Sequence, residues 1–222
     1  MARIKLTLSA NAGGALQLGS HRLLIDALHN KKVPGFSTLE EASRQVIFTH
    51  PDFIFPELIC LTHTHADHYS KSMTDEAMAR WTGTKCLMPE PLQQRTGDLE
   101  VAFLPLIHDG AAYENTPHYG ILLTWQGKNI LISGDCRIAD EALIRSLMGK
   151  QIDLAIMNFP WLTLRKGREC LQTVIKPKHC VFWHLPFLED DVNGYRSSAE
   201  AALRQYPGRL LCDPFQTIEL DI

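Results

Sequence analysis

The sequence predicts an α/β protein of the α+β type, in which sheet packs on sheet with helices outside, and three observations support this class. Short runs rich in β-branched and aliphatic residues alternate with helix-like segments along the chain. Glycine turns at Gly13–Gly14 and Gly19–Ser20 separate the first three runs, which is typical of an antiparallel meander. The 222 residues suit one domain, or two intimately packed halves, and are enough for a sizeable core. We therefore expect a single domain over residues 1–222.

The elements follow from hydrophobic periodicity, with a second hairpin turning at Gly127–Lys128. Ser37 and Glu40 have the spacing of a capping box before the first helix. The last two strands are expected to form a pair. The expected strands are 4–10, 15–19, 22–27, 58–62, 85–89, 101–107, 120–125, 129–134, 153–158, 180–184, 209–213 and 217–221, and the expected helices are 38–48, 72–81, 139–149, 165–175 and 196–206.

Composition limits the class of function. A formal charge of -3 gives no electrostatic reason to expect nucleic-acid or membrane-surface binding. The N-terminal residues lack the apolar segment of a signal peptide, and no apolar run approaches the roughly 18 residues of a membrane span. The six cysteines form no C-x-x-C pair, so we expect reduced, mostly buried thiols in a cytoplasmic protein. A small-molecule substrate is the expected partner, and the sequence indicates no oligomeric state.

Residues 61–70, LTHTHADHYS, concentrate three histidines and an aspartate after an apolar run. Imidazole and carboxylate groups are ligands for zinc and similar metals. Residues two apart on a strand share a face, so His63 and His65 are expected to point the same way. With a third imidazole from elsewhere they would make a three-ligand site with an open position. Asp67 and His68 would begin a second site.

The pattern His63-Thr-His65-Ala-Asp67-His68 resembles the signature of the metallo-β-lactamase superfamily, and further motifs of that family follow its order along most of the chain. Each lies at the end of an apolar strand. They are Asp26 in LLIDA, His118 in PHYGILL, Asp135 in ISGD and His184 in CVFWHLP.

The resemblance implies a four-layer αββα sandwich of two mixed sheets flanked by helices, and a metal site built from seven side chains. His63, His65 and His118 would hold one metal, Asp67, His68 and His184 the other, and Asp135 would bridge them. Asp26 would orient a ligand from behind, although an Asp that caps the turn after RLLI is the simpler interpretation. The cofactor would be two divalent ions, with zinc as the default and manganese or iron as alternatives.

The activity implied is that of a binuclear metallohydrolase that uses a metal-bridging hydroxide on a small ester, lactone or phosphodiester. Asp67 would be the catalytic side chain that orients the water. The chain resembles compact stand-alone members such as sugar-phosphate lactonase-like hydrolases. Two alternatives remain: a single-iron oxidoreductase of the sulfur-dioxygenase type, and a ligand-sensing protein that keeps the site without turnover.

Other residues compete for roles near this site. His108, in LIHDG, ends a strand and is the rival of His118, which is preferred because it precedes an apolar hairpin strand. His29 follows Asp26 and is a candidate for lining the pocket. His21 and His50 are expected at the surface, and Cys136 is expected to take no part in the chemistry. Trp161, Arg165, Lys166 and Arg168 are candidates for gripping a phosphate or carboxylate.

Overall fold

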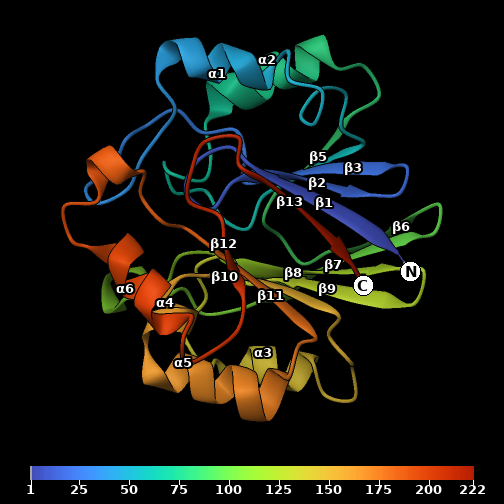
Figure 1. The fold of residues 1–222 in the computed structure, drawn as a ribbon. Coiled ribbons are helices and arrows are strands. Elements are labelled where there is room, and N and C mark those ends of the chain that lie inside the picture. Colours follow the sequence, from blue (N-terminus) through green and yellow to red (C-terminus); the bar gives the residue numbers. More distant parts are fainter. Residues whose placement is uncertain (1) are drawn as a thin grey trace. The chain divides into compact units, whose positions relative to one another are not determined.

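The computed structural model describes residues 2–222 and divides the chain into two compact units. The first unit contains the chain up to Met88 together with His184–Arg196 and Leu211–Asp221. The second contains Pro89–Trp183, Ser197–Leu210 and Ile222. Each unit is built on one mixed β-sheet, drawn in Figure 1 with the helices that flank it.

The sheet of the first unit has the order β13-β1-β2-β3-β4-β5. β13, β1, β2 and β3 pair antiparallel, as the glycine turns predict, and β3, β4 and β5 pair parallel. β3 and β4 are buried almost throughout, as parallel strands covered on both faces are. The bounds are β1 Arg3–Leu8, β2 Gly14–Leu18, β3 His21–Ile25, β4 Leu58–Cys60, β5 Lys85–Leu87 and β13 Thr217–Asp221.

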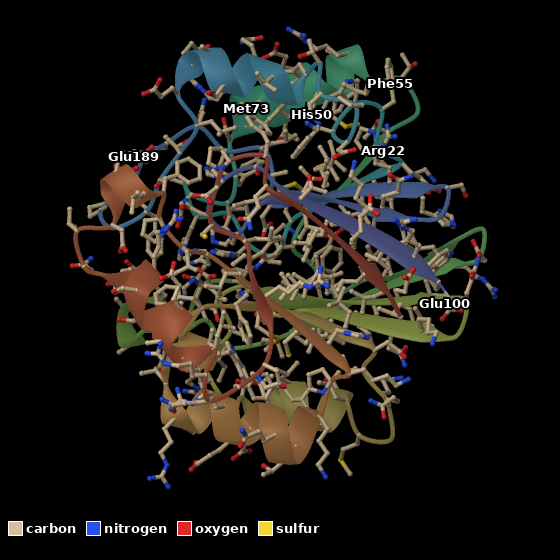
Figure 2. The ribbon with its side chains drawn as sticks, in the orientation of Figure 1. Arg22, His50, Phe55, Met73, Glu100 and Glu189 are labelled. Carbon is tan, nitrogen blue, oxygen red and sulfur yellow. The ribbon has the colours of Figure 1, made fainter. Side chains whose placement is uncertain are left out.

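Helices α1 (Glu41–Ile47) and α2 (Lys71–Arg80) flank one face of this sheet. The unit also contains the short 3-10 helix η3 (Leu188–Asp190). A buried core joins the two helices to the sheet and includes Phe53 and Trp81. Met73 of α2, labelled in Figure 2, belongs to the same core.

The sheet of the second unit has the order β12-β11-β10-β9-β8-β7-β6. β6 to β9 pair antiparallel, and β9 to β12 pair parallel. The bounds of the strands are β6 Gln93–Thr96, β7 Leu99–Pro105, β8 Tyr119–Trp125, β9 Lys128–Ile132, β10 Leu154–Asn158, β11 His179–Trp183 and β12 Arg209–Leu210. The helices are η1 Ala111–Tyr113, α3 Glu141–Ser146, α4 Pro160–Thr163, α5 Arg165–Cys170, the π-helical η2 Leu171–Ile175 and α6 Tyr195–Ala202. Helix α6 starts at the end of the first unit.

The expected elements are present with shifted ends, but several details differ. β6 was not predicted, because its residues, QQRT, are polar as befits an edge strand. α4 was not predicted either. β12 and β13 do not pair with each other, since β12 adds to β11 and β13 to β1. The capping box at Ser37 is wrong, because α1 starts after Glu40, and Ser37 makes other hydrogen bonds described below.

Two further expectations concern buried groups. All six cysteines, which lie within the described residues, are unbridged, and only Cys86 is not fully buried, as predicted. His21, expected at the surface, is instead buried, with its Nδ1 atom 2.6 Å from Oε2 of Glu57. None of the helices described for residues 2–222 has the length and apolar character that a membrane crossing requires.

The turn between β1 and β2 lies against the backbone that follows β3. A Cβ atom at Gly13 would lie 2.3 Å from the carbonyl oxygen of Asp26 and 2.8 Å from Cα of Ala27. Both are backbone atoms, which cannot move aside by a change of rotamer. Only glycine fits this close approach.

Gly13→Ala should therefore lower the free energy of unfolding by about 1–3 kcal/mol, the usual cost of overpacking. Gly120→Ala is the control, because its closest neighbour is Cδ1 of Leu106, the end of a flexible side chain, at 2.7 Å. Urea unfolding of the two variants and the parent measures the difference. Equal midpoints for Gly13→Ala and the parent would contradict the steric argument.

Candidate functional site

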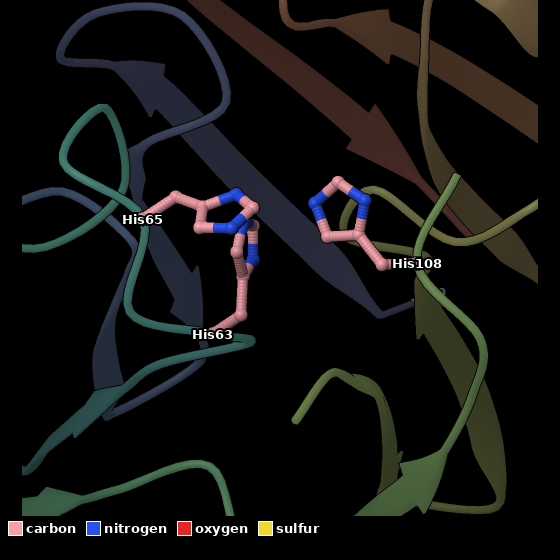
Figure 3. Close-up of side chains that lie close together, drawn as sticks. All are labelled: His63, His65 and His108. Atoms are coloured by element: carbon pink, nitrogen blue, oxygen red, sulfur yellow. The ribbon is translucent and has the colours of Figure 1, made fainter. Parts of the chain in front are cut away.

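The predicted metal-binding residues start in the segment after β4. β4 ends at Cys60, two residues before the predicted end at 62, so His63 and His65 lie in the following loop and not directly at the strand end. Their rings nevertheless lie against each other, with centroids 4.6 Å apart and planes at 81°. Figure 3 shows these two rings, and it also labels His108, which belongs to the second unit.

The segment then turns sharply toward α2. The backbone N–H groups of His68 and Tyr69 both donate to the carbonyl of His65, at 3.0 and 2.9 Å. Ser70 caps α2 by accepting from the N–H of Met73, and its own N–H donates to the carbonyl of Leu28 at 2.7 Å. This compact turn carries Asp67 and His68 into the buried interior of the first unit.

Asp26, directly after β3, is a buried carboxylate that organises this segment. Its Oδ1 accepts from the N–H of Thr62 at 2.8 Å, and its Oδ2 accepts from the hydroxyl of Thr62 at 2.6 Å. Oδ2 also lies 3.0 Å from Nδ1 of His68. As the resemblance implied, Asp26 therefore supports a predicted ligand from behind, and it is more than a cap for its own turn.

These contacts determine which nitrogen of each histidine carries a lone pair. A carboxylate only accepts, so Nδ1 of His68 carries a proton and the lone pair lies on Nε2. The Thr62 hydroxyl gives its one proton to Asp26, so it accepts from Nδ1 of His63 at 2.9 Å. His63 consequently presents the lone pair of Nε2 as well. One carboxylate thus sets the tautomers of two predicted ligands.

His184, directly after β11, meets His68 within the first unit. The Nε2 atoms of the two rings are 3.1 Å apart, and Oδ2 of Asp67 lies 3.6 Å from Nε2 of His184. Ligand atoms of Asp67, His68 and His184 all lie within 4.8 Å of one another, which is the grouping that a metal ion needs. With metal–nitrogen bonds of about 2.0–2.1 Å, two nitrogens of a tetrahedral site are roughly 3.3 Å apart.

The backbone of His184 is left-handed, with a φ of 63°, which is uncommon for a residue with a side chain. Its N–H donates to the carbonyl of Asn11 at 2.9 Å. The ring of Phe36 lies 4.3 Å from the His184 ring, centroid to centroid. Sequence reasoning found neither Asn11 nor Phe36, because neither belongs to a metal-binding pattern.

His29 is buried beside this group. Its Nε2 atom lies 3.3 Å from the carbonyl of Ala10, which only accepts, so Nε2 carries the proton. Burial, reinforced by the nearby His68, lowers the pKa of His29 to about 4. Burial thus favours the neutral form of His29, with its Nε2 proton directed at the carbonyl of Ala10.

The second unit brings together His108, His118 and Asp135. The backbone N–H of Asp135 donates to Nε2 of His118 at 2.9 Å. Nδ1 of His108 donates to the carbonyl of Asp109 at 2.6 Å, which leaves the lone pair on Nε2, 3.8 Å from Oδ2 of Asp135. The Nδ1 contact of His108 leaves Nε2 as its nitrogen nearest the Asp135 carboxylate, whereas His118 accepts from the Asp135 backbone N–H.

The contacts of Cys136 and of the basic segment 161–168 are with other residues of the fold. Burial, with Asp140 and Asp135 nearby, raises the pKa of the Cys136 thiol, so it is a poor nucleophile. Trp161 is buried, and Arg168 donates to the carbonyls of Leu162 and Thr163. Arg165 forms an ion pair with Glu169. Of the four candidate residues in this segment, Lys166 lines a surface cavity of about 520 Å³.

Of the seven predicted ligands, the structure thus gathers five in the first unit and two in the second. The five are His63, His65, Asp67, His68 and His184, and the two are His118 and Asp135.

Comparison with known proteins gives a fold but no close relative. No family model matches the chain, and no curated protein sequence matches it. Among solved structures, the metallo-β-lactamase fold protein YhfI from Bacillus subtilis is similar at a TM-score of 0.59 and 16% identity, with 99% of this chain and 100% of that chain covered. An isothiocyanate hydrolase from Delia radicum gut bacteria is similar at a TM-score of 0.65 and 15% identity, with 96% and 98% covered.

A third similar structure is CmlA, a diiron β-hydroxylase from Streptomyces venezuelae, at a TM-score of 0.60 and 13% identity. The match covers 99% of this chain but only 54% of CmlA. Two mixed sheets with flanking helices, and near-complete coverage by such structures, agree with the fold that the sequence motifs imply. The chain therefore has the metallo-β-lactamase fold.

Proposed function

We propose that this chain is a binuclear metal-dependent hydrolase that cleaves a small ester, lactone or phosphodiester. The observation that carries the proposal is the buried group of Asp67, His68 and His184, in which two imidazole nitrogens lie 3.1 Å apart. Buried polar groups are normally paired, and such a group of potential ligands is costly to maintain without a role. The isothiocyanate hydrolase of the same fold supports hydrolysis as the class of reaction.

The donor set fits divalent metal ions. It is rich in neutral imidazoles, which suits zinc, and it contains carboxylates, which also suit manganese and iron. Asp26 supplies the outer carboxylate that typically orients a metal-binding histidine. The proposed ligands are His63, His65, Asp67, His68, Asp135, His184 and one of the pair His118 and His108.

The choice within that pair remains a prediction. The sequence favours His118 because of its place before an apolar hairpin strand. The hydrogen bonds favour His108, since Nε2 of His118 already accepts from the Asp135 amide. In this second interpretation His118 holds the Asp135 backbone, and His108 supplies the ligand nitrogen.

Bound metal ions would supply a water of lowered pKa and would polarise the substrate. The residues of the chain would do the rest. Asp67 is the proposed catalytic side chain: its buried carboxylate would orient the attacking water and hold the proton that the water releases. Asp26 and Thr62 would keep His63 and His68 in the tautomers that present Nε2.

A second candidate is an iron-dependent oxidoreductase, including the single-iron sulfur-dioxygenase type. The similarity to CmlA favours it, because CmlA is a diiron β-hydroxylase and shares this fold over part of its length. Oxygen consumption by iron-loaded protein, set against hydrolysis by zinc-loaded and manganese-loaded protein over a panel of esters, lactones and phosphodiesters, separates the two. A protein that keeps bound metal but turns over nothing would instead be a ligand sensor.

Metal content is the first test. Fully loaded protein should contain about two metal ions per chain. His184→Ala should lower the content to about one, because it removes a ligand of only one ion. His50→Ala is the matched control, since the His50 ring stacks on Phe215 and not on a proposed ligand. Elemental analysis after dialysis gives the ratio, and two ions retained in His184→Ala would contradict the ligand assignment.

The third-ligand question has its own test. We expect His108→Ala to lower metal affinity by about 10-fold or more, and His118→Ala to have a smaller effect that follows from a less rigid Asp135. Competition with a chromophoric chelator measures both affinities. The reverse order would favour the sequence-based choice of His118. Asp135→Asn should weaken both metal ions, and unchanged affinity in that variant would rule out a bridging carboxylate.

The role of Asp67 predicts a loss of turnover beyond the loss of metal. At equal metal content, Asp67→Ala should lower kcat by about 100-fold or more, since an orienting and proton-accepting group is gone. Asp52→Ala is the control, because that carboxylate binds Lys5 and Thr7 instead. The parent should also lose activity as pH falls, because protons compete for the histidine ligands. Full activity in Asp67→Ala would remove it from the mechanism.

A further inference from the structure

The turn between β1 and β2, residues 9–13, is buried and tightly closed. The N–H of Ser9 donates to the carbonyl of Gly13 at 2.8 Å, and the N–H of Gly13 donates to that of Ala10 at 2.9 Å. At its centre Asn11 is left-handed, with a φ of 48°, a conformation that asparagine tolerates better than most residues. The side chain of Asn11 is fully buried.

The Asn11 amide grips the backbone of Ser37 with both of its polar atoms. Oδ1 accepts from the N–H of Ser37 at 2.9 Å, and Nδ2 donates to the carbonyl of Ser37. The Ser37 hydroxyl in turn accepts from the N–H of Phe187 at 2.7 Å. One asparagine therefore joins three segments of the first unit that are remote in sequence.

The backbone of Asn11 makes the remaining connection, because its carbonyl accepts from the N–H of His184. The segment 184–187 is thus held at its start by Asn11 and at its end by Ser37. Phe36, next to Ser37, contacts the His184 ring. Since the left-handed backbone of His184 is unfavourable in itself, it persists only where the surroundings hold it.

We propose that Asn11 is a positioning residue that fixes the His184 imidazole opposite His68 through its contacts with Ser37 and with the His184 backbone. This rests on the proposed function, in which His184 is a metal ligand. A ligand must be held within about 0.5 Å of its working position, and the contacts of Asn11 with the Ser37 backbone and with the His184 N–H provide such a restraint. Asn11 supplies the restraint from the opposite end of the chain.

The variant Asn11→Gly isolates the side chain. Glycine keeps the left-handed backbone and the carbonyl that accepts from His184, but it loses both hydrogen bonds to Ser37. Asn11→Asp is the conservative variant, since a carboxylate still accepts from the Ser37 N–H but no longer donates to its carbonyl. Gln126→Gly is the matched control, because Gln126 is exposed and has a φ of 49°.

Titration with Co²⁺ provides a readout that is independent of turnover, because its visible absorption reports coordination. Asn11→Gly should bind the second Co²⁺ about 10- to 100-fold more weakly than the parent and with an altered spectrum. Asn11→Asp should fall between the two, and Gln126→Gly should match the parent. Ser37→Ala, which removes the acceptor for Phe187 but keeps the Asn11 contacts, should shift the affinity in the same direction and serves if Asn11→Gly fails to fold.

Two results would overturn the proposal. One is parent-like affinity and spectrum in both Asn11→Gly and Ser37→Ala. The other is a fall only in the unfolding midpoint of the metal-free protein, with parent-like Co²⁺ binding, which would make Asn11 structural. His184→Ala is titrated in parallel: if it still binds two ions as the parent does, the proposed function itself has failed, and a loss there with unchanged Asn11 variants rejects the positioning role alone.

Discussion

The contact between the Asp26 carboxylate and its three donors is the interaction on which the rest of the candidate site depends. Asp26 accepts from the amide and hydroxyl of Thr62 and from Nδ1 of His68. A buried carboxylate is costly unless such charge-assisted bonds compensate for its lost hydration. These bonds lie near the ends of β3 and β4. The hydrogen bonds that compensate for the burial of Asp26 therefore also orient the histidine rings.

Parallel strands explain why the predicted ligands gather in this way. β3 and β4 run parallel, so the residues that follow them emerge at the same edge of the sheet. The N–H of Asp26 donates to the carbonyl of Cys60, which joins the two strand ends directly. Left-handed backbone at Asp26 and at His184 turns the chain sharply at the points where these side chains are needed. Such conformations cost about 1–3 kcal/mol each and are concentrated at functional sites.

Much of this could be predicted from the sequence, for identifiable reasons. The meander strands and the segment around His63 carry strong local signals: alternating apolar runs, glycine turns and clustered imidazoles. The role of Asn11 carried no such signal, since its partner Ser37 is 26 residues away and Ser37 bonds a group 150 residues away. Ser37 and Glu40 have the spacing of a capping box, but α1 starts after Glu40, so the sequence pattern was misleading there. The polar edge strand β6 lacked the apolar pattern by which strands are recognised. The sequence favoured His118 over His108 because His118 precedes an apolar hairpin strand, but it carries no information on the hydrogen bonds that the two rings make with Asp109 and Asp135.

The buried histidines also connect the stability of the fold to the candidate metal site. Burial disfavours the charged form of His29 and lowers its pKa in the folded chain to about 4, below the usual value of 6.5. The unfolded chain therefore takes up a proton that the folded chain refuses as pH falls below 6.5, and the stability that the neutral His29 contributes is lost progressively toward pH 4. In the proposed function, protons would also compete with metal ions for His63, His68 and His184 as the pH falls below neutral. Low pH would thus lower the stability of the fold through His29, whose Nε2 atom lies against the same turn that contacts the His184 backbone. It would also protonate the proposed ligands directly. Both effects have the same sign, so a metal-loaded fold is favoured at neutral and higher pH, where the proposed hydrolysis also requires deprotonated water.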